Sequence, residues 1–395
     1  MSAAGERLRR RYLLTGIGAG TLGALAFAIL PLLLGEYAAL LALDDASVGW
    51  LGSTYVAGYT LTTGAAFLWV ERAPWPMVHL TGALLMVLGF SVAASSLGYQ
   101  TALLGFALAG AGSGLMFALS CALVACRDDA DRAFALKIFP EQGFPALLLF
   151  LLPVAVIAPF GIQGLLIFLA IVAMIGAFSC SFTPGAPLSR STAEEAVNVA
   201  HGRGLPTAIA LLGLLLFFCG FAGFWAFAEI ILVDSGVDKA AAGRLLGIGV
   251  VASAIGPLFT AAIADYFGRV RPLLLLLGLI IAGLLLMSQL SGLIAFTALF
   301  ALLPAAWYAG IAYQMGIIAD VDLSGRFSVL MAAALGLGAT IGPVLYGEIK
   351  SADGLAAANV VAALVTATGI ACTIWAVRNA PTVSRRITGA ESSPD

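Results

Sequence analysis

Long apolar stretches separated by short polar segments follow one another along almost the whole chain. Each stretch has roughly 20 residues, the length that an α-helix needs to cross the hydrocarbon core of a bilayer. The pattern therefore predicts an all-α membrane protein with twelve transmembrane helices. The expected spans are 13–35, 48–70, 77–97, 101–125, 138–158, 164–182, 206–232, 241–264, 272–289, 293–319, 327–347 and 357–377.

The basic residues between these spans predict the orientation of the chain. With both termini in the cytoplasm, the segments on that side contain all but three of the 19 lysines and arginines. The outer segments contain only Lys239, Arg244 and Lys350. Cytoplasmic loops of membrane proteins are enriched in Lys and Arg, so this distribution predicts a multi-pass protein of the cytoplasmic (inner) membrane with both ends inside. No Lys or Arg remains for the middle of any span.

Composition excludes several classes of protein. Only 10% of the residues are charged, against about 25% in soluble domains, so the lipid bilayer is the expected surrounding. The net charge of -2 and the lack of a basic patch argue against a nucleic-acid partner. Five cysteines without paired spacing and two histidines predict neither a metal site nor a cofactor. No nucleophile–base pair or metal cluster can be assembled, so an enzyme is not expected.

An internal repeat divides the chain into two halves. A shift of 194 residues superimposes five pairs of landmarks, all in or beside loops. These pairs are Asp44 and Asp238, Gly49 and Gly243, Glu71 and Asp265, Asp128 and Asp322, and Arg132 and Arg326. The repeat predicts two six-helix bundles, 1–182 and 206–377, joined by a cytoplasmic linker at 183–205 and followed by a cytoplasmic tail at 378–395.

The loop at 265–271 carries a family resemblance. In the stretch 256–272, Asp265, Gly268, Arg269 and Arg271 match the loop signature Gly-x-x-x-Asp-Arg-x-Gly-Arg-Arg, while Ala261 replaces its first Gly. The chain thereby resembles the major facilitator superfamily, whose members are transporters of two six-helix halves. The resemblance implies alternating access, with a substrate site between the halves. The matching loop of the first half, at 71–76, keeps an acid but lacks the Gly-Arg pair.

The resemblance also implies residues that gate the cytoplasmic side. Asp265, Arg269 and Arg271 would form a latch that holds when this side closes, although they could instead be ordinary positive-inside anchors. The loops 128–132 and 322–326 are expected to supply further gate ion pairs. Their charged residues are Asp128, Arg132, Asp322 and Arg326. Exposed ion pairs of this kind contribute about 0–1 kcal/mol, enough to bias a conformational equilibrium.

Three glutamates are candidates for proton coupling. Glu229 ends the seventh span and Glu36 the first, and an acid in or near a membrane helix is a candidate proton or cation site. Both lie near an expected helix end, so either could simply reach water. Glu141 follows Pro140 at the expected start of the fifth span, where helix-start chemistry alone would explain it.

The tenth span carries the best candidates for substrate contact. Trp307 and Gln314 share one helical face, and a buried Gln in lipid needs a partner. Tyr308 and Trp225, which lies in the aromatic run before Glu229, complete the expected set. The alternative is that Gln314 only bonds to another helix.

These observations predict a monomeric secondary active transporter. Without basic residues in the spans, an anion would stay unpaired, so a small neutral, aromatic or weakly cationic organic solute is expected. Protons are the expected coupling ion. One exporter signal is missing and one is displaced: Phe106 stands where antiporters have Arg, and Gly-x-x-x-Gly-Pro occurs at 338–343 rather than in the fifth span. Uptake is therefore favoured over two alternatives, proton-driven efflux of lipophilic compounds and a non-transporting sensor or assembly subunit.

Overall fold

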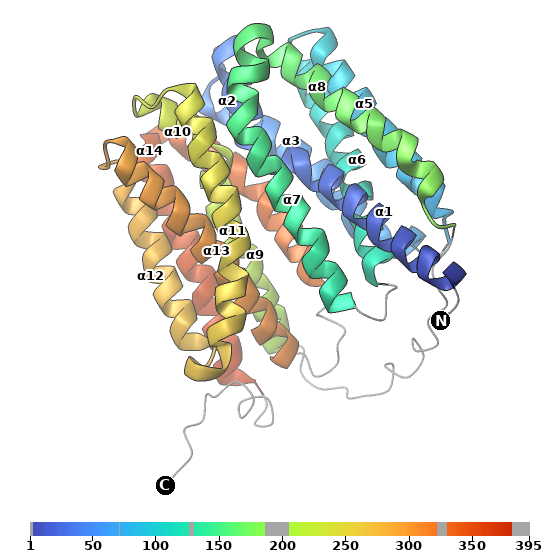
Figure 1. Ribbon diagram of the computed structural model, residues 1–395. Coiled ribbons are helices and arrows are strands. Elements are labelled where there is room, and N and C mark those ends of the chain that lie inside the picture. The colour runs from blue at the N-terminus through green and yellow to red at the C-terminus, as the bar shows by residue number, and fades with distance from the viewer. Residues whose placement is uncertain (1–2, 71, 126–129, 186–204, 322–329, 381–395) are drawn as a thin grey trace. The chain divides into compact units, whose positions relative to one another are not determined.

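The structure is a computed structural model that describes residues 3–70, 72–125, 130–185, 205–321 and 330–380 (Figure 1). Its elements are helices joined by short turns, as the hydropathy pattern predicts. They are α1 Ala3–Ala28, α2 Leu30–Leu41, α3 Asp45–Gly64, α4 Ala66–Trp69, α5 Trp75–Ser95, α6 Tyr99–Ala125, α7 Ala130–Leu152, α8 Ala158–Phe178, α9 Leu205–Ala226, α10 Ala228–Asp234, α11 Lys239–Phe267, α12 Val270–Leu286, α13 Leu293–Val321 and α14 Met331–Asn379. A π-helical turn at Pro153–Ile157 joins α7 to α8, and a 3-10 turn at Ser179–Phe182 follows α8.

Eight helical segments of the described residues are long and apolar enough to cross a membrane. Two of them, Leu136–Phe182 and Met331–Asn379, have 47 and 49 residues, about twice the length that one crossing needs. Each contains a glycine whose backbone leaves the helix: Gly161 has φ 62° and Gly354 has φ 84°. The all-α membrane class is thus confirmed, while the count of twelve spans stays a prediction.

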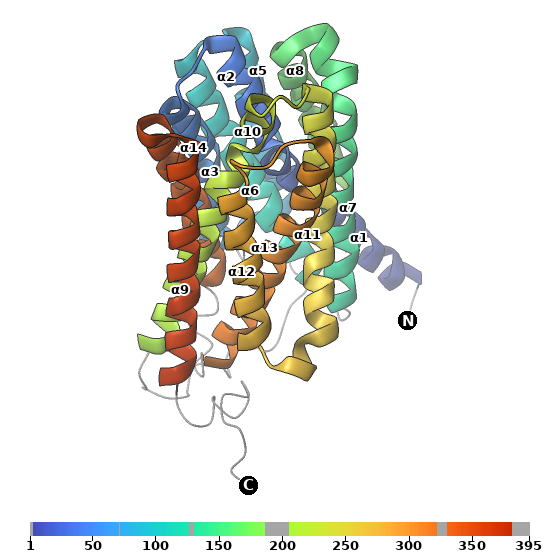
Figure 2. The same ribbon diagram turned by 90° about the vertical axis from the view of Figure 1, so that its left-hand side faces the viewer.

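The chain divides into two compact units. The first contains Met1–Arg190 and Ala226–Val250, and the second contains Ser191–Trp225 and Val251–Asp395. Within each unit the long helices run alongside one another, as two perpendicular views show (Figures 1 and 2). The domain boundary that the sequence predicts, 183–205, lies mostly outside the described residues and stays a prediction.

Glycines bring the helices of the first unit close together around α6. A Cβ added to Gly105 would lie 2.5 Å from the carbonyl oxygen of Gly89 in α5. A Cβ on Gly110 would overlap the carbonyl oxygen of Tyr55 in α3. The small-residue run in α6 therefore acts through close backbone packing, the ordinary role of such residues in membrane helices.

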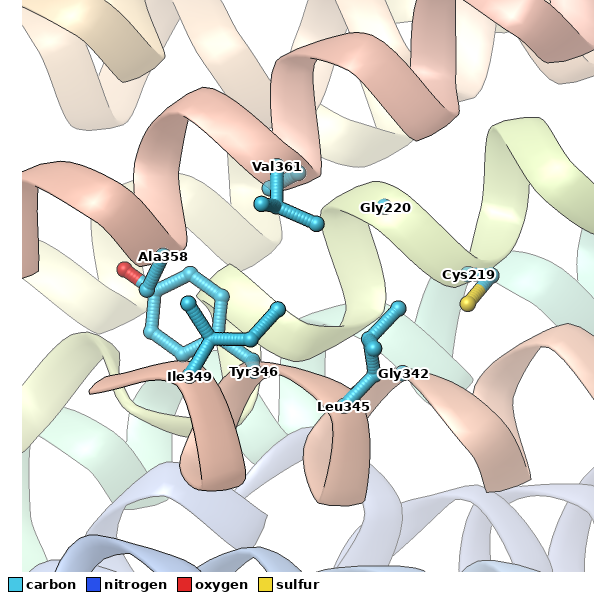
Figure 3. A pocket seen from close by; sticks show the side chains of 9 residues that line it. Cys219, Gly220, Gly342, Leu345, Tyr346, Ile349, Ala358 and Val361 are labelled. Atoms are coloured by element: carbon cyan, nitrogen blue, oxygen red, sulfur yellow. The ribbon is translucent and has the colours of Figure 1, made fainter. Parts of the chain in front are cut away.

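In the second unit, α9 packs against α14 on both sides of Gly354. A Cβ added to Gly342, which precedes Gly354, would lie 2.5 Å from the carbonyl oxygen of Cys219. A Cβ added to Gly220 would lie 2.5 Å from the carbonyl oxygen of Ala362, which follows Gly354. Gly338 and Gly342, the displaced exporter-like run, are therefore packing residues here. A small pocket opens between these segments (Figure 3). None of its nine lining residues is charged, so we interpret it as a gap in helix packing rather than a polar site.

Two aspartates explain one landmark of the sequence repeat. The side chain of Asp44 caps α3 by accepting a hydrogen bond from the amide of Ser47 at 2.8 Å. Asp238 precedes α11 and accepts from the amide of Ala241 at 3.0 Å. Each carboxylate thus satisfies an amide that the first turn of a helix leaves free. The 194-residue offset brings together two helix starts of the same kind.

Candidate functional site

The first unit brings Glu36 and Glu229 together, although 193 positions separate them in the sequence. A break at Ile29 separates α2 from α1, and a break at Phe227 separates α10 from α9. Glu36 lies in α2 and Glu229 in α10, and these two short helices pack against each other. A Cβ on Gly35 would overlap the Oε2 atom of Glu229, so the carboxylate lies directly against the backbone of α2.

Lys239 is the third member of this cluster. Its ammonium forms an ion pair with Glu36, with 2.5 Å between Nζ and Oε1. The side chain of Lys239 is 44% exposed and that of Glu36 is 10% exposed, so the pair reaches solvent. The sequence placed Lys239 in an outer segment and gave no signal for this partner, because the contact depends on the packing of α2 beside the start of α11.

Glu229 remains the uncompensated acid of the cluster. It is 2% exposed, and its Oε1 has no hydrogen-bond partner in the described structure. Lys239 forms its ion pair with Glu36 rather than with Glu229, and a buried charge without a partner is costly. Such an acid can lower its energy by taking up a proton or by binding a cation. This is the chemistry that proton coupling requires.

The third glutamate, Glu141, has a different environment from the one expected. α7 begins at Ala130, so Pro140 lies inside a helix and the helix-start interpretation of Glu141 is wrong. Glu141 forms an ion pair with Lys137, one turn earlier, with 2.5 Å between Nζ and Oε1. Both side chains are nearly inaccessible, at 2% for Lys137 and 5% for Glu141.

Lys137 is a buried basic residue at the start of a candidate span, so the expectation of no Lys or Arg in the middle of a span is not contradicted. The sequence placed it just before a span starting at 138, but it is buried within the candidate span Leu136–Phe182. The available signal was the four-residue spacing from Glu141, which puts the two charges on one helical face. Because Glu141 neutralises Lys137, the pair adds no net charge to the span.

The predicted substrate contacts of α13 lie in the second unit and are buried. Trp307 is 3% exposed and packs between Phe218 and Phe221 of α9, with ring centroids 4.6 and 4.4 Å away. Its Nε1 has no hydrogen-bond partner in the described residues. Tyr308 lies edge-on to Trp307 at 5.0 Å. The environment is aromatic, with one indole donor left unused.

Gln314 and Trp225 complete the predicted set. The amide oxygen of Gln314 accepts a hydrogen bond from Thr373 of α14 at 2.8 Å, so the helix-bridging interpretation applies to this atom. Its Nε2, however, has no partner in the described part of the chain. Trp225 is partly exposed and lies 6.4 Å from Phe300.

Among the described residues, the loop that carries the family resemblance forms an ion pair with α13. Gly268 adopts φ 65°, a backbone conformation that favours glycine, and so turns the chain from α11 into α12. Arg269 then pairs with Asp320 near the end of α13, with 2.5 Å between Nη1 and Oδ2. Asp320 was not among the predicted residues. Arg271 is exposed.

The remaining predicted gate residues fall outside what the structure describes. Asp128, Asp322 and Arg326 lie outside the described residues, as do the side chains of Arg132 and Asp265.

Comparisons with known proteins agree with the fold. Residues 210–394 match the sequence model of the Major Facilitator Superfamily. A bacterial homologue of the human lysosomal transporter Spinster, solved inward-facing and unoccupied, matches with a TM-score of 0.66 and 14% identity over 100% of both chains. The same kind of homologue, inward-facing and occupied, matches with a TM-score of 0.68 and 15% identity over 98% of this chain and 97% of the other.

No curated protein sequence matches the chain significantly. At 14% and 15% identity, the likeness to these two structures concerns the fold. A shared fold does not identify a transported compound. The family match covers the C-terminal part, and the fold match covers the first half as well. The C-terminal part of the chain, residues 210–394, thus matches the Major Facilitator Superfamily, and the whole chain is similar in fold to a bacterial homologue of a lysosomal transporter.

Proposed function

We propose that the protein is a proton-coupled secondary active transporter that takes up a small neutral, aromatic or weakly cationic organic solute across the cytoplasmic membrane by alternating access. The observation that carries this proposal is the buried carboxylate of Glu229, which has no partner at Oε1 and lies beside an already paired Glu36 and Lys239. A protonatable group in such a place can tie proton uptake to a conformational change.

The coupling mechanism follows from the charge balance of the cluster. With Glu229 ionised, Glu36, Glu229 and Lys239 together carry one negative charge in excess, and Asp234 of α10 adds a further acid that acts on Glu229. Protonation of Glu229 leaves a single neutral Glu36–Lys239 pair, which removes the repulsion between two neighbouring carboxylates. Since α2 and α10 pack through Gly35 and Glu229, the protonation state acts directly on the contact between these two helices.

The polarity of the solute is inferred from the buried charges. Lys137 is the buried Lys or Arg of the described residues, and Glu141 already neutralises it. An anionic solute would have to break that ion pair, and breaking a buried pair is expensive. A neutral or weakly cationic solute avoids this cost. The unused donors of Trp307 and Gln314, together with the rings of Tyr308 and Trp225, are the proposed contacts in the second unit.

Solute-driven proton entry into proteoliposomes tests the proposal. Purified protein is reconstituted with an internal pH dye, and a panel of neutral, cationic and anionic aromatic compounds is added outside. Neutral or cationic members are expected to acidify the interior in the wild type. In Glu229→Gln this proton entry is expected to fall at least tenfold, because the variant cannot take up the proton.

The matched control is Asp353→Asn, which changes an exposed acid of α14 in the same way and should behave as wild type. Equal proton entry in Glu229→Gln and wild type would overturn the coupling role. Solute binding without any solute or proton movement in the wild type would instead indicate a non-transporting protein.

A further inference from the structure

We propose that the first unit contains a binding site for a neutral, hydroxyl-bearing aromatic compound, formed by the Lys137–Glu141 ion pair and the rings of Phe27, Tyr59 and Phe117. This inference rests on the proposed transport of small aromatic solutes and names their chemical class more closely. It concerns a part of the chain that the predicted substrate residues of the second unit do not include.

The Lys137–Glu141 ion pair is held in place by a neighbouring aromatic ring. Lys137 and Glu141 lie on one face of α7, and the ammonium also lies 4.4 Å from the centre of the Phe117 ring in α6. A cation over an aromatic face is stabilised by the ring quadrupole. The ammonium is therefore held at a defined position by a carboxylate and a ring.

Gly20 of α1 has no Cβ, which lets these groups lie directly against the helix backbone. A Cβ added to Gly20 would overlap Oε1 of Glu141 and would lie 2.9 Å from Cε of Lys137. It would also lie 2.5 Å from Oγ of Ser120, a residue of α6. The carboxylate, the lysine side chain and the serine hydroxyl thus converge on one point beside the backbone of α1.

Ser120 supplies an independent sign that this niche accepts a ligand. It is completely buried, and its Oγ has no hydrogen-bond partner in the described structure. A buried hydroxyl without a hydrogen-bond partner is costly, and buried polar groups ordinarily have one. A hydroxyl of a bound compound would be such a partner.

Aromatic side chains continue from the ion pair toward a more accessible region. Phe117 packs against Tyr59 of α3 with ring centroids 5.7 Å apart, and Tyr59 stacks on Phe27 of α1 at 6.1 Å. All three are only partly buried, in contrast to Lys137 and Glu141. Ring separations of 4.5–7 Å are typical of favourable aromatic pairs, so this set could accept one more ring.

The ion pair favours a hydroxyl over a charged group. A hydroxyl can accept a hydrogen bond from the ammonium of Lys137 and donate one to the carboxylate of Glu141, and the net charge of the niche stays zero. A carboxylate ligand would bring a second negative charge beside Glu141. An ammonium ligand would bring a second positive charge beside Lys137. Either would place a like charge next to a buried group, which is unfavourable in a low dielectric.

Binding of three ligands of matched size tests the inference. The dissociation constants of benzyl alcohol, benzylamine and benzoate are measured by calorimetry on the purified full-length protein. Benzyl alcohol is expected to bind at least tenfold more tightly than benzoate and benzylamine. The variants Ser120→Ala and Phe117→Leu are each expected to weaken its binding at least threefold, because one removes a hydrogen-bond partner and the other a ring face.

Thermal unfolding of each variant establishes that it folds, and Gly18→Ala, where an added Cβ meets nothing within 4 Å, is the matched control for changes beside α1. Tightest binding of benzoate or benzylamine, or unchanged affinity in both folded variants, would overturn the inference. The proposed function can fail separately. If Glu229→Gln binds benzyl alcohol normally and its proton entry equals that of wild type, the binding site stands and the coupling role of Glu229 is excluded.

Discussion

At the scale of single residues, two glycines make room for the buried glutamates of this protein. Gly35 lies against the carboxylate of Glu229, and Gly20 lies against that of Glu141. Both are positions where a glycine in a helix would ordinarily be unfavourable compared with alanine. The missing Cβ instead leaves room for a buried acid at the backbone of the neighbouring helix.

Gly35→Ala is therefore expected to displace Glu229 and to damage coupling. The added methyl would overlap Oε2, and forcing extra volume into a packed site costs about 1–3 kcal/mol. We expect a lower melting temperature and at least a fivefold loss of solute-driven proton entry. Gly18→Ala, which meets no neighbouring atom within 4 Å, should leave both measurements unchanged. Normal proton entry in Gly35→Ala would contradict the placement of Glu229.

At the scale of helices, the turns and caps determine where the charged residues lie. α11 begins at Lys239 directly after its capping residue Asp238, so the cap fixes the position of the lysine that pairs with Glu36. Asp44 caps α3 in the same manner. Pro31 lies in the first turn of α2, where the missing amide hydrogen of proline does no harm, and this favours a new helix after the break at Ile29.

Removal of the Asp44 cap is expected to destabilise the protein by about 1 kcal/mol at neutral pH. The hydrogen bonds from Ser47 lower the pKa of Asp44 below its ordinary 3.8. A group with a lowered pKa in the folded state contributes stability above its unfolded pKa and loses it as the pH falls through the folded value. Asp44→Ala should therefore melt at a lower temperature than wild type at pH 7.

The same comparison at about pH 3 provides the check on the cause. There the difference in melting temperature between Asp44→Ala and wild type should shrink, since protonation weakens the cap in the wild type. Asp45→Ala, one residue further, changes an acid without removing the cap bond to Ser47. A difference that does not depend on pH would contradict the capping role.

At the scale of the whole molecule, the proposed alternating access requires states of nearly equal free energy. Small ion pairs can then shift the balance without being needed for folding. Arg269 and Asp320 form such a pair within the second unit, and their side chains are 31% and 16% exposed. Partial exposure limits the contribution to about 0–1 kcal/mol.

Arg269→Ala is expected to change the rate of solute-driven proton entry by up to about fivefold, because 1 kcal/mol corresponds to roughly that change in an equilibrium constant. The melting temperature should change little. The exchanged pair Arg269→Asp with Asp320→Arg should recover most of the wild-type rate. If the exchanged protein folds but transports no better than Arg269→Ala, the pair does not bias the transport cycle.

The sequence alone determined the class of this protein. Repeated apolar stretches predicted the all-α membrane fold, and the loop at Asp265, Gly268, Arg269 and Arg271 indicated the family. These properties can be read from sequence because hydropathy, helix-forming length and loop motifs are local. Glu36, Glu141 and Glu229 stood out for the same reason, since an acid is rare in such surroundings.

Only the tertiary structure decided which of these charges meet. It joined Glu36 to Lys239, placed Glu229 at Gly35, and buried Lys137 beside Glu141 and Ser120. Each contact depends on the rotation and separation of helices that are distant in sequence, and a missing Cβ can matter as much as a charge. A linear pattern specifies that a helix crosses the membrane, whereas its neighbours and contacting face are determined by the packing of all helices together.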